Sequence, residues 1–462
     1  MKCDPVRLRA LEILLEVDAG ERLEPALAAG LAAMEDPRSS AFLAELVRGT
    51  IQWQARYDHV IAAFSRKRPP NDPVLIGILR LSLHQLLGLD GVPPYAAIHQ
   101  AGELCHRKSS RGKVGFINGM LQAIRRRVVP QENDRMLRED NLRELFAELE
   151  SDRPRWLAAW YSLPSWLVNR WIKSFGLTNA EELCVWVNEP VALHLHVLAN
   201  HSAPATAEHL IALDLNVEEV EGPGTLFVTD RPSRQQLRDV LASTPQVIVQ
   251  DVSVQQATKW LATGMPTTAP VLDMCAAPGG KTAHLCGLLG DSITIVGMDN
   301  KPTRVALLSD TLSRVAENRA PIVIADGGNP PFANDTFGGI LLDGPCSGTG
   351  VLRHHPDGRW LLKASTPANK AKALLNLAHK AADMLVPGGR LMYATCSLEP
   401  EENDQVISAL LEQRSDLEPD PGEDGLWRKY WLPFEKVSGR PNRGDGFFAA
   451  RLKKSHPEKK SD

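Results

Sequence analysis

From about residue 232 to residue 455, short apolar runs alternate with stretches of helical pattern. The runs have the length of buried strands and read VIVQ, VLDM, ITIVGMD, IVIAD, ILLD and RLMYAT, with helical segments such as TRVALLSDTLSRVAE between them. Strands that alternate with helices predict an α/β domain with a mostly parallel, doubly wound sheet. Ligands of such sheets bind outside the carboxyl ends of the strands. The residues that close each run are therefore the first place to look for a site.

One run leads into a loop of small residues. VLDM is followed by CAAPGGKT and then by a helical stretch, HLCGLL. Small residues let backbone amides approach a ligand at a helix amino terminus. A P-loop would need glycine at the position of Cys275, and the dinucleotide pattern G-x-G-x-x-G is absent. A tight turn without a ligand is the alternative interpretation. We predict a cofactor loop formed by Cys275, Ala276, Ala277, Pro278, Gly279, Gly280 and Lys281.

Three acids, Asp299, Asp326 and Asp343, close three successive runs. Each of them alone is more often a cap or turn residue than a ligand. Three together at one edge of a sheet favour a binding site. A carboxylate at Asp299 can accept both hydroxyl groups of a ribose, and Asp326 is placed to accept a hydrogen bond from an adenine amino group. The pattern predicts an adenosyl cofactor.

Two cysteines, Cys346 and Cys396, follow two strand ends in ILLDGPCSG and LMYATCSLEPEEN. A lone cysteine there is usually an inert small residue. Two thiols beside Asp343 match the methylation of cytosine at C5, because a thiolate must add at C6 before C5 can attack a methyl sulfonium. One cysteine attacks, Asp343 meets the charge at N3, and Cys346, or water that it orients, assists product release.

The attacking thiol needs help to ionise, since a free thiol has a pKa of about 8.5. We expect a helix amino terminus or a nearby cation to stabilise the thiolate. The EPEEN segment after Cys396 is predicted to begin that helix.

The amino-terminal part, residues 1–130, reads as helices, and Asp72 and Pro73 mark the start of one of them. The net charge of -4 gives no global sign of a nucleic-acid binder, so an RNA surface must be local. Between Ala101 and Pro130 the only acid is Glu103, and the cations predict a phosphate-binding face or, alternatively, an ordinary solvated helix surface. These cations are Arg107, Lys108, Arg111, Lys113, Arg125, Arg126 and Arg127.

Composition changes predict further boundaries. Residues 131–153 are acid-rich and are predicted to form an exposed, partly helical connector. Residues 154–231 combine a helix signal, PSWLVNRWIKSFG, with short apolar runs such as VALHLHVLA, which predicts a small α/β domain. The parallel sheet is expected in residues 232–455, and residues 456–462 are expected to be a disordered charged tail.

Cysteine usage and hydropathy exclude several classes of protein. The seven cysteines are scattered without a CxxC pair, which argues against a disulfide framework and against a metal site. No stretch offers the run of about 18 apolar residues that a membrane span needs. We expect a soluble cytoplasmic protein that binds no metal.

The residues that carry chemistry resemble those of the RNA cytosine-C5 methyltransferases of the Sun and RsmB group. The resemblance implies a class I methyltransferase domain of Rossmann-like fold in which DMCAAPGGKT binds S-adenosylmethionine, DGPCSG carries a supporting aspartate and cysteine, and TCS carries the nucleophile, here Cys396. DNA cytosine methyltransferases attack instead with the cysteine of a proline-cysteine motif. The presence of both Cys346 and Cys396 points to RNA.

The resemblance extends over most of the chain, through VIVQDVSVQQ, RHHPDGRWL and DGFFAARLKK. The helices of residues 1–130, with GFINGMLQAIRRR, are similar to the NusB-like RNA-binding domain, and residues 154–231 to a family linker that also contacts RNA. A NusB-like domain before the catalytic domain implies 16S ribosomal RNA as substrate, free or in a partly assembled small subunit, and a monomeric enzyme. Methylation of another RNA such as transfer RNA, and an RNA-binding regulator with an inactive catalytic domain, remain as alternatives.

Some positions depart from the family pattern. Gly344 stands where alanine is usual, Val254 where serine is common and Gln122 where arginine is usual. His196 and Leu198 stand where a strand of the family carries an arginine and an asparagine.

Overall fold

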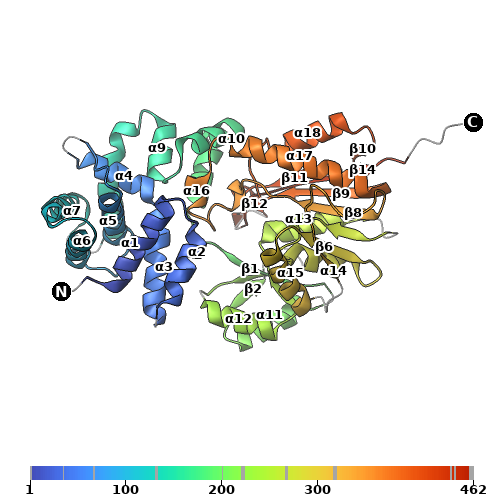
Figure 1. The fold of residues 1–462 in the computed structure, drawn as a ribbon, viewed down its shortest axis with the longest axis horizontal. Coiled ribbons are helices and arrows are strands. Elements are labelled where there is room, and N and C mark those ends of the chain that lie inside the picture. Colours follow the sequence, from blue (N-terminus) through green and yellow to red (C-terminus); the bar gives the residue numbers. More distant parts are fainter. Residues whose placement is uncertain are drawn as a thin grey trace, which may run out of the picture. The chain divides into compact units, whose positions relative to one another are not determined.

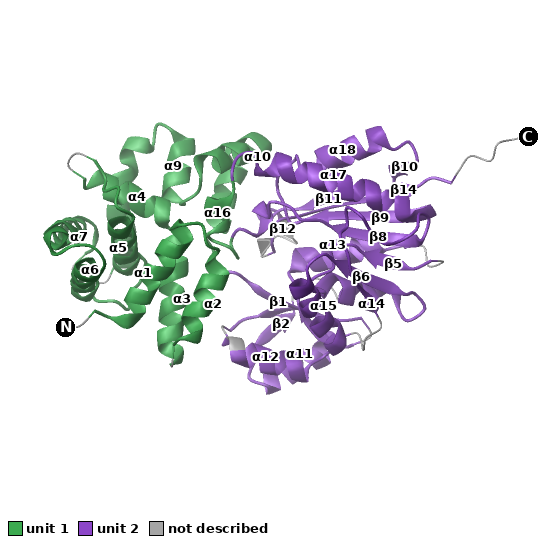
Figure 2. Cartoon of the chain, in the orientation of Figure 1, with its two compact units in different colours: residues 1–189, 353–362 green, residues 190–352, 363–462 purple. Residues whose placement is uncertain are grey.

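The chain forms two compact units in a computed structural model (Figure 2). Unit 1 comprises residues 1–189 and 353–362, and unit 2 comprises residues 190–352 and 363–462. The structure describes residues 3–34, 36–65, 68–130, 134–199, 201–219, 224–230, 232–265, 269–315, 320–437, 440–441 and 444–456. Residues 457–462, which carry most of the predicted charged tail, lie outside the described residues.

The described part of unit 1 is built from helices (Figure 1). As predicted, Asp72 caps a helix that begins at Pro73, and its carboxylate accepts a hydrogen bond from the Val74 amide at 2.9 Å. Gly176 interrupts one long helix with φ +81°, so α10 consists of two helical parts. The α-helices of unit 1 are α1 (Pro5–Asp18), α2 (Leu23–Ala32), α3 (Pro37–Gln52), α4 (Gln54–Ala63), α5 (Pro73–Leu83), α6 (Pro94–Lys108), α7 (Val114–Val128), α8 (Arg135–Arg143), α9 (Arg153–Trp160), α10 (Ser165–Trp186) and α16 (Gly358–Leu361).

The acid-rich segment predicted as a connector is folded into unit 1, apart from residues 131–133, which are outside the described part. α8 and the 3-10 helix Glu144–Leu149 bury Leu142, Phe146 and Leu149. Phe146 packs edge-on against Trp160 of α9 at 5.1 Å between ring centroids. Because this apolar face needs α9 as its partner, the unit continues past the predicted boundary at residue 153 and ends at Glu189.

Residues 353–362 also belong to unit 1, although they lie within the range predicted for the parallel sheet. Arg359 is 1% exposed. It donates to the Ser162 carbonyl at 3.2 Å, to the Val187 carbonyl at 3.2 Å and to Asn188 Oδ1 at 3.0 Å. Trp360 donates its indole N–H to the Ile51 carbonyl at 3.0 Å. These contacts hold the segment among the helices of unit 1.

Unit 2 begins with a four-stranded antiparallel sheet in the order β2-β3-β1-β4. Its strands are β1 (Leu193–Val197), β2 (Val217–Glu219), β3 (Thr225–Val228) and β4 (Val247–Val249), and it is accompanied by α11 (Ala203–Ala212) and α12 (Arg234–Ser243). The run VIVQ was predicted for the parallel sheet, but it forms β4 and pairs antiparallel with β1, with Leu195 opposite Val249. The small sheet therefore extends to Val249, beyond the predicted limit at residue 231, because β4 completes its buried core.

The second sheet of unit 2 has the order β10-β14-β9-β8-β5-β6-β7, with β11 paired to β14. The pairs among β5 to β9 are parallel, and β14 runs antiparallel to β9. The predicted doubly wound, mostly parallel sheet is confirmed. Its strands are β5 (Val271–Asp273), β6 (Ile295–Asp299), β7 (Ile322–Ile324), β8 (Phe337–Asp343), β9 (Leu385–Thr395), β10 (Leu417–Pro419), β11 (Arg428–Trp431) and β14 (Phe447–Lys454), and β12 (Lys436–Val437) and β13 (Arg440–Pro441) form a separate hairpin.

Helices cover both faces of this sheet (Figure 1). On β8, Leu341 packs in one core and Leu342 in the other, because successive side chains of a strand point to opposite faces. One face is covered by α13 (Val252–Ala262), α14 (Gly280–Leu289) and α15 (Pro302–Val315), and the other by α17 (Thr366–Met384) and α18 (Asp404–Gln413). The strand order reverses between β5 and β8, so a crevice is expected at their carboxyl ends.

Candidate active site

A cavity of about 580 Å³ lies at this reversal point. It brings together seven of the predicted site residues, from both sides of the reversal. They are Cys275, Ala277, Asp299, Asp326, Asp343, Cys346 and Cys396. The cavity is also lined by cations and an amide that the sequence analysis did not identify: Lys301, Arg304 and Asn376. The remaining predicted loop residues, Ala276, Pro278, Gly279, Gly280 and Lys281, are not among those that line it.

The loop after β5 is fixed to the end of β6. Asp299 is 3% exposed, and its carboxylate accepts a hydrogen bond from the Ala277 amide at 3.4 Å. Arg304 on α15 pairs with this carboxylate at 3.3 Å and donates to the Ala277 carbonyl at 2.9 Å. Gly279 has φ +107°, and a Cβ there would meet the Leu308 side chain at 3.0 Å. Glycine therefore allows the sharp turn into α14.

Lys281 is not among the residues that line the cavity, but it forms an ion pair with Asp343, which is, with Nζ 2.6 Å from Oδ2. Burial lowers the pKa of Lys281, but the ion pair and hydrogen bond with Asp343, together with the nearby Asp273 and Cys396, act in the opposite direction, and the pKa is raised. The predicted loop lysine thus remains charged and holds the carboxylate at the end of β8.

The thiols of Cys346 and Cys396 are 3.3 Å apart. The pKa of Cys396 is raised well above its ordinary value, first by the neighbouring Cys346 thiol and then by burial. The expected cation is present, since Lys281 acts to lower this pKa, but it is outweighed. The EPEEN segment forms turns, and α18 begins only at Asp404. These contacts favour the neutral thiol form of Cys396.

A buried carboxylate joins the two cysteine loops. Glu402 is fully buried and accepts hydrogen bonds from the Ser347 amide at 2.6 Å, from the Ser347 hydroxyl and from the Ser397 hydroxyl. Burial raises the pKa of Glu402, and its hydrogen bonds act in the opposite direction. Each serine directly follows one of the site cysteines. The sequence analysis did not identify Glu402, although its place in EPEEN, six residues after Cys396, was visible.

Glycines allow the loops to approach. A Cβ on Gly350 would lie 2.2 Å from the Gly446 carbonyl oxygen and 2.9 Å from that of Cys396. A Cβ on Gly344 would lie 2.3 Å from the side chain of Leu374, which is fully buried. Leu374 thus explains why glycine stands where the family usually has alanine.

The seven predicted RNA-binding cations are all exposed on α6, α7 and the turn between them in unit 1. Three of them are paired with acids: Lys108 with Glu12 at 2.7 Å, Lys113 with Asp72 at 2.8 Å, and Arg127 with Glu144 at 2.5 Å. The other four form no ion pair with a described residue. They are Arg107, Arg111, Arg125 and Arg126.

Three further features of the described residues bear on cofactors and location. All seven cysteines are free thiols. No group of three or more potential metal ligands was found there. None of the helices that the structure describes has the length and hydropathy needed to cross a membrane.

Comparisons with known proteins agree with the fold. Residues 261–453 match the family 16S rRNA methyltransferase RsmB/F, and residues 4–126 match the NusB family. The chain is 31% identical over 467 residues to the probable ribosomal RNA small subunit methyltransferase B of Bacillus subtilis, and the match covers 98% of this chain and 100% of the relative. The chain belongs to the ribosomal RNA small subunit methyltransferase B family.

Another member of the methyltransferase B family, from Shewanella oneidensis, is 28% identical over 460 residues, covering 97% of this chain and 98% of the relative. A solved structure, that of PH0851, has a TM-score of 0.72 with 23% identity and covers 98% of this chain and 100% of that one, which shows a shared fold. The predicted membership of the RsmB group is confirmed, and with it a NusB-like domain followed by a methyltransferase domain that uses S-adenosylmethionine.

Proposed function

We propose that this protein transfers a methyl group from S-adenosylmethionine to C5 of a cytosine in 16S ribosomal RNA, through a covalent bond between Cys396 and C6. The observation that carries the proposal is the pair of thiols, Cys346 and Cys396, 3.3 Å apart in a cavity that Asp343 also lines. A single nucleophile would need only one thiol. A second thiol in contact with the first supports a reaction in which one group attacks and another assists release.

The residues of the cavity fit the cofactor. Asp299 and Asp326 line it and offer carboxylate oxygens to a ribose and to an adenine amino group. A volume of about 580 Å³ is in the range of ligand sites. When bound there, S-adenosylmethionine supplies a methyl group on a positively charged sulfur.

The protein's own groups would move the protons and hold the base. In the addition step, Cys396 loses its proton and its sulfur forms a bond to C6. N3 gains a proton through Asp343, so the number of protons does not change in this step. After C5 carries the methyl group, its hydrogen leaves as a proton, either to water that Cys346 orients or to Cys346 itself in the thiolate form. The bond between sulfur and C6 then breaks, the ring regains its double bond, N3 returns its proton, and Cys396 departs as thiolate.

The test separates the two thiols. Cys396→Ala should abolish methylation of 16S RNA while calorimetry shows unchanged affinity for S-adenosylmethionine, because the thiol acts on cytosine. Cys346→Ala should accumulate a protein-RNA species that survives denaturing electrophoresis, forms only with S-adenosylmethionine and disappears in the double variant. Cys3→Ala, which changes a cysteine of unit 1, is the control and should behave as wild type. Normal turnover of Cys346→Ala, or an adduct in the double variant, would contradict these roles.

The substrate is tested with purified RNAs. Incubation with radiolabelled S-adenosylmethionine should label 16S RNA, free or in partly assembled subunits, and bisulfite sequencing should locate the modified cytosine. If transfer RNA is labelled and 16S RNA is not, the result favours a methyltransferase that acts on transfer RNA. Binding of RNA without any methyl transfer would favour a regulator with an inactive catalytic domain.

A further inference from the structure

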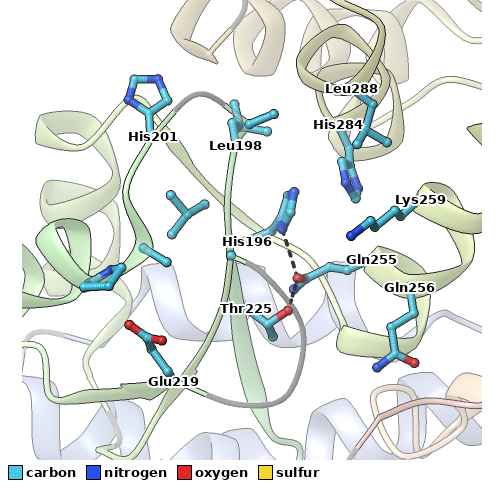
Figure 3. Close-up of a pocket in the computed structure, with 15 residues that line it drawn as sticks. His196, Leu198, His201, Glu219, Thr225, Gln255, Gln256, Lys259, His284 and Leu288 are labelled. Atoms are coloured by element: carbon cyan, nitrogen blue, oxygen red, sulfur yellow. Dashed lines mark hydrogen bonds between the residues drawn. The ribbon is translucent and has the colours of Figure 1, made fainter. Parts of the chain in front are cut away.

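Unit 2 contains a second cavity, of about 490 Å³ (Figure 3), which shares no lining residue with the cavity of the two thiols. It is enclosed by β1 and β3 of the small sheet on one side and by α13 and α14 on the other. Its polar lining includes His196, Thr225, Gln255, Lys259 and His284. The proposed methyl transfer uses none of these residues.

The hydrogen bonds around Gln255 determine the tautomer of His196. The Gln255 amide nitrogen donates to the Gln250 carbonyl at 2.7 Å, so its Oε1 is the acceptor. This oxygen accepts from the Thr225 hydroxyl at 2.7 Å and faces His196 Nδ1 at 3.0 Å (Figure 3). Nδ1 must therefore carry the hydrogen, which leaves Nε2 with a lone pair. Nε2 is buried and has no hydrogen-bond partner among the described residues.

A second imidazole lies against the first. His284 is 2% exposed, and its ring centroid is 3.9 Å from that of His196. Its Nδ1 lies 3.1 Å from Gln250 Oε1. Burial lowers the pKa of His196 to about 4 and that of His284 well below its ordinary value, so both rings are neutral at physiological pH. Figure 3 shows the Lys259 side chain directed toward the two rings.

We propose that this cavity receives one nucleobase of the RNA substrate, other than the cytosine that is methylated, with the phosphate of that nucleotide near Lys259. The inference rests on the proposed function and extends it to substrate recognition. A buried acceptor without a donor is costly, and a base amino or imino group supplies the donor that His196 Nε2 lacks.

The chemistry of the cavity favours a nucleotide over other ligands. Splayed bases of single-stranded RNA bind by stacking on aromatic rings and by hydrogen bonds to their edges. Here a buried acceptor, two imidazole rings in contact with each other and a cation at an exposed position occur together, so a hydrogen bond to the base edge is the contact that the cavity offers. His201 and Glu219 also line the cavity, but no group of three or more potential metal ligands is arranged to hold an ion among the described residues, and Lys259 would repel one. The volume lies within the range of small-molecule sites.

The test uses the full-length protein and an oligoribonucleotide that spans the methylated cytosine. His196→Leu removes the acceptor and should weaken binding about tenfold, as loss of one hydrogen bond does. His209→Leu is the matched control, because His209 is an exposed histidine of the same small domain, on α11. Lys259→Gln alters an exposed side chain, so folding is preserved, and should reduce the slope of log affinity against log salt by about 0.7.

A direct measurement comes from the histidine ring signals. With wild-type protein, addition of the oligonucleotide or of nucleoside monophosphates should shift the His196 and His284 resonances in a saturable way. If these signals stay unmoved while the RNA is bound and methylated, the inference is wrong and the proposed function stands. If wild type methylates no cytosine, the proposed function fails instead. Normal affinity and salt slope in both variants would also overturn the inference.

Discussion

At the scale of single residues, Glu402 holds the two site thiols together. One carboxylate accepts hydrogen bonds from Ser347 and Ser397, which follow Cys346 and Cys396 in the chain. Hydrogen bonds to charged groups contribute about 1.5–3 kcal/mol each, so Glu402→Ala should lower kcat about tenfold or more while KM for S-adenosylmethionine changes little. Glu402→Gln, which keeps one acceptor, should lose less. Steady-state methylation measures both effects.

A second readout distinguishes this positioning role from a general loss of stability. The contact with Cys346 is the first cause of the raised pKa of Cys396. If Glu402→Ala lets the thiols separate, the pKa of Cys396 falls, and alkylation of Cys396 should begin at a lower pH than in wild type. Glu412→Ala, on the exposed side of α18, is the control. An unchanged alkylation profile with normal kcat would refute the role of Glu402.

At the scale of elements, the segment 353–362 is held in unit 1 by a buried guanidinium without a carboxylate partner among the described residues (Figure 2). Burial lowers the pKa of Arg359 to about 9. Arg359→Met leaves several buried acceptors without a donor, at about 1–3 kcal/mol each. We expect the free energy of unfolding to fall by about 3 kcal/mol. Urea titration monitored by tryptophan fluorescence measures this change.

The same variant should expose the segment to proteases. Arg353 is 8% exposed, which protects the bond that follows it. Trypsin should cut after Arg353 faster in Arg359→Met than in wild type. The control is Lys363→Ala, which changes an exposed residue just beyond the segment. This control should leave the rate of cleavage after Arg353 and the free energy of unfolding unchanged. Equal protection of Arg353 in the two variants would show that Arg359 does not anchor the segment.

At the scale of the whole molecule, the net charge of -4 repels the negatively charged phosphates of RNA. Electrostatic attraction of RNA must therefore come from a local cluster of cations on the surface. The structure divides the predicted face into paired and unpaired cations. Reversal of the unpaired Arg125 and Arg126 to Glu should reduce the slope of log affinity against log salt by about 1.4, since each phosphate contact to a single strand contributes about 0.7. Arg127→Glu should do less, because Glu144 already neutralises Arg127.

Filter binding at several salt concentrations measures these slopes. Arg38→Glu, on α3, is the control for reversal of a single exposed charge outside the predicted face. If the slope for the double variant equals that of Arg38→Glu, the cations of α6 and α7 form an ordinary solvated surface.

Much of the cavity at the reversal of the large sheet could be predicted from the sequence. An apolar run ends at each of Asp299, Asp343 and Cys396, and parallel strands bring their carboxyl ends to one edge of a sheet. Local sequence patterns were therefore sufficient to predict that these residues line the same cavity. The cap at Asp72 was equally predictable, because the hydrogen bond from the Val74 amide spans only two residues.

Contacts between residues far apart in the sequence were decided only by the tertiary structure. Val249 reads like any buried strand residue, and its pairing with Leu195 assigned it to the antiparallel sheet. Arg359 has the composition of a surface residue, yet carbonyl groups contributed by two separate stretches of unit 1 bury it. The contact between Cys346 and Cys396 sets the pKa of the thiol. Burial and pairing depend on which surfaces meet in three dimensions, and periodicity along the chain does not contain that information.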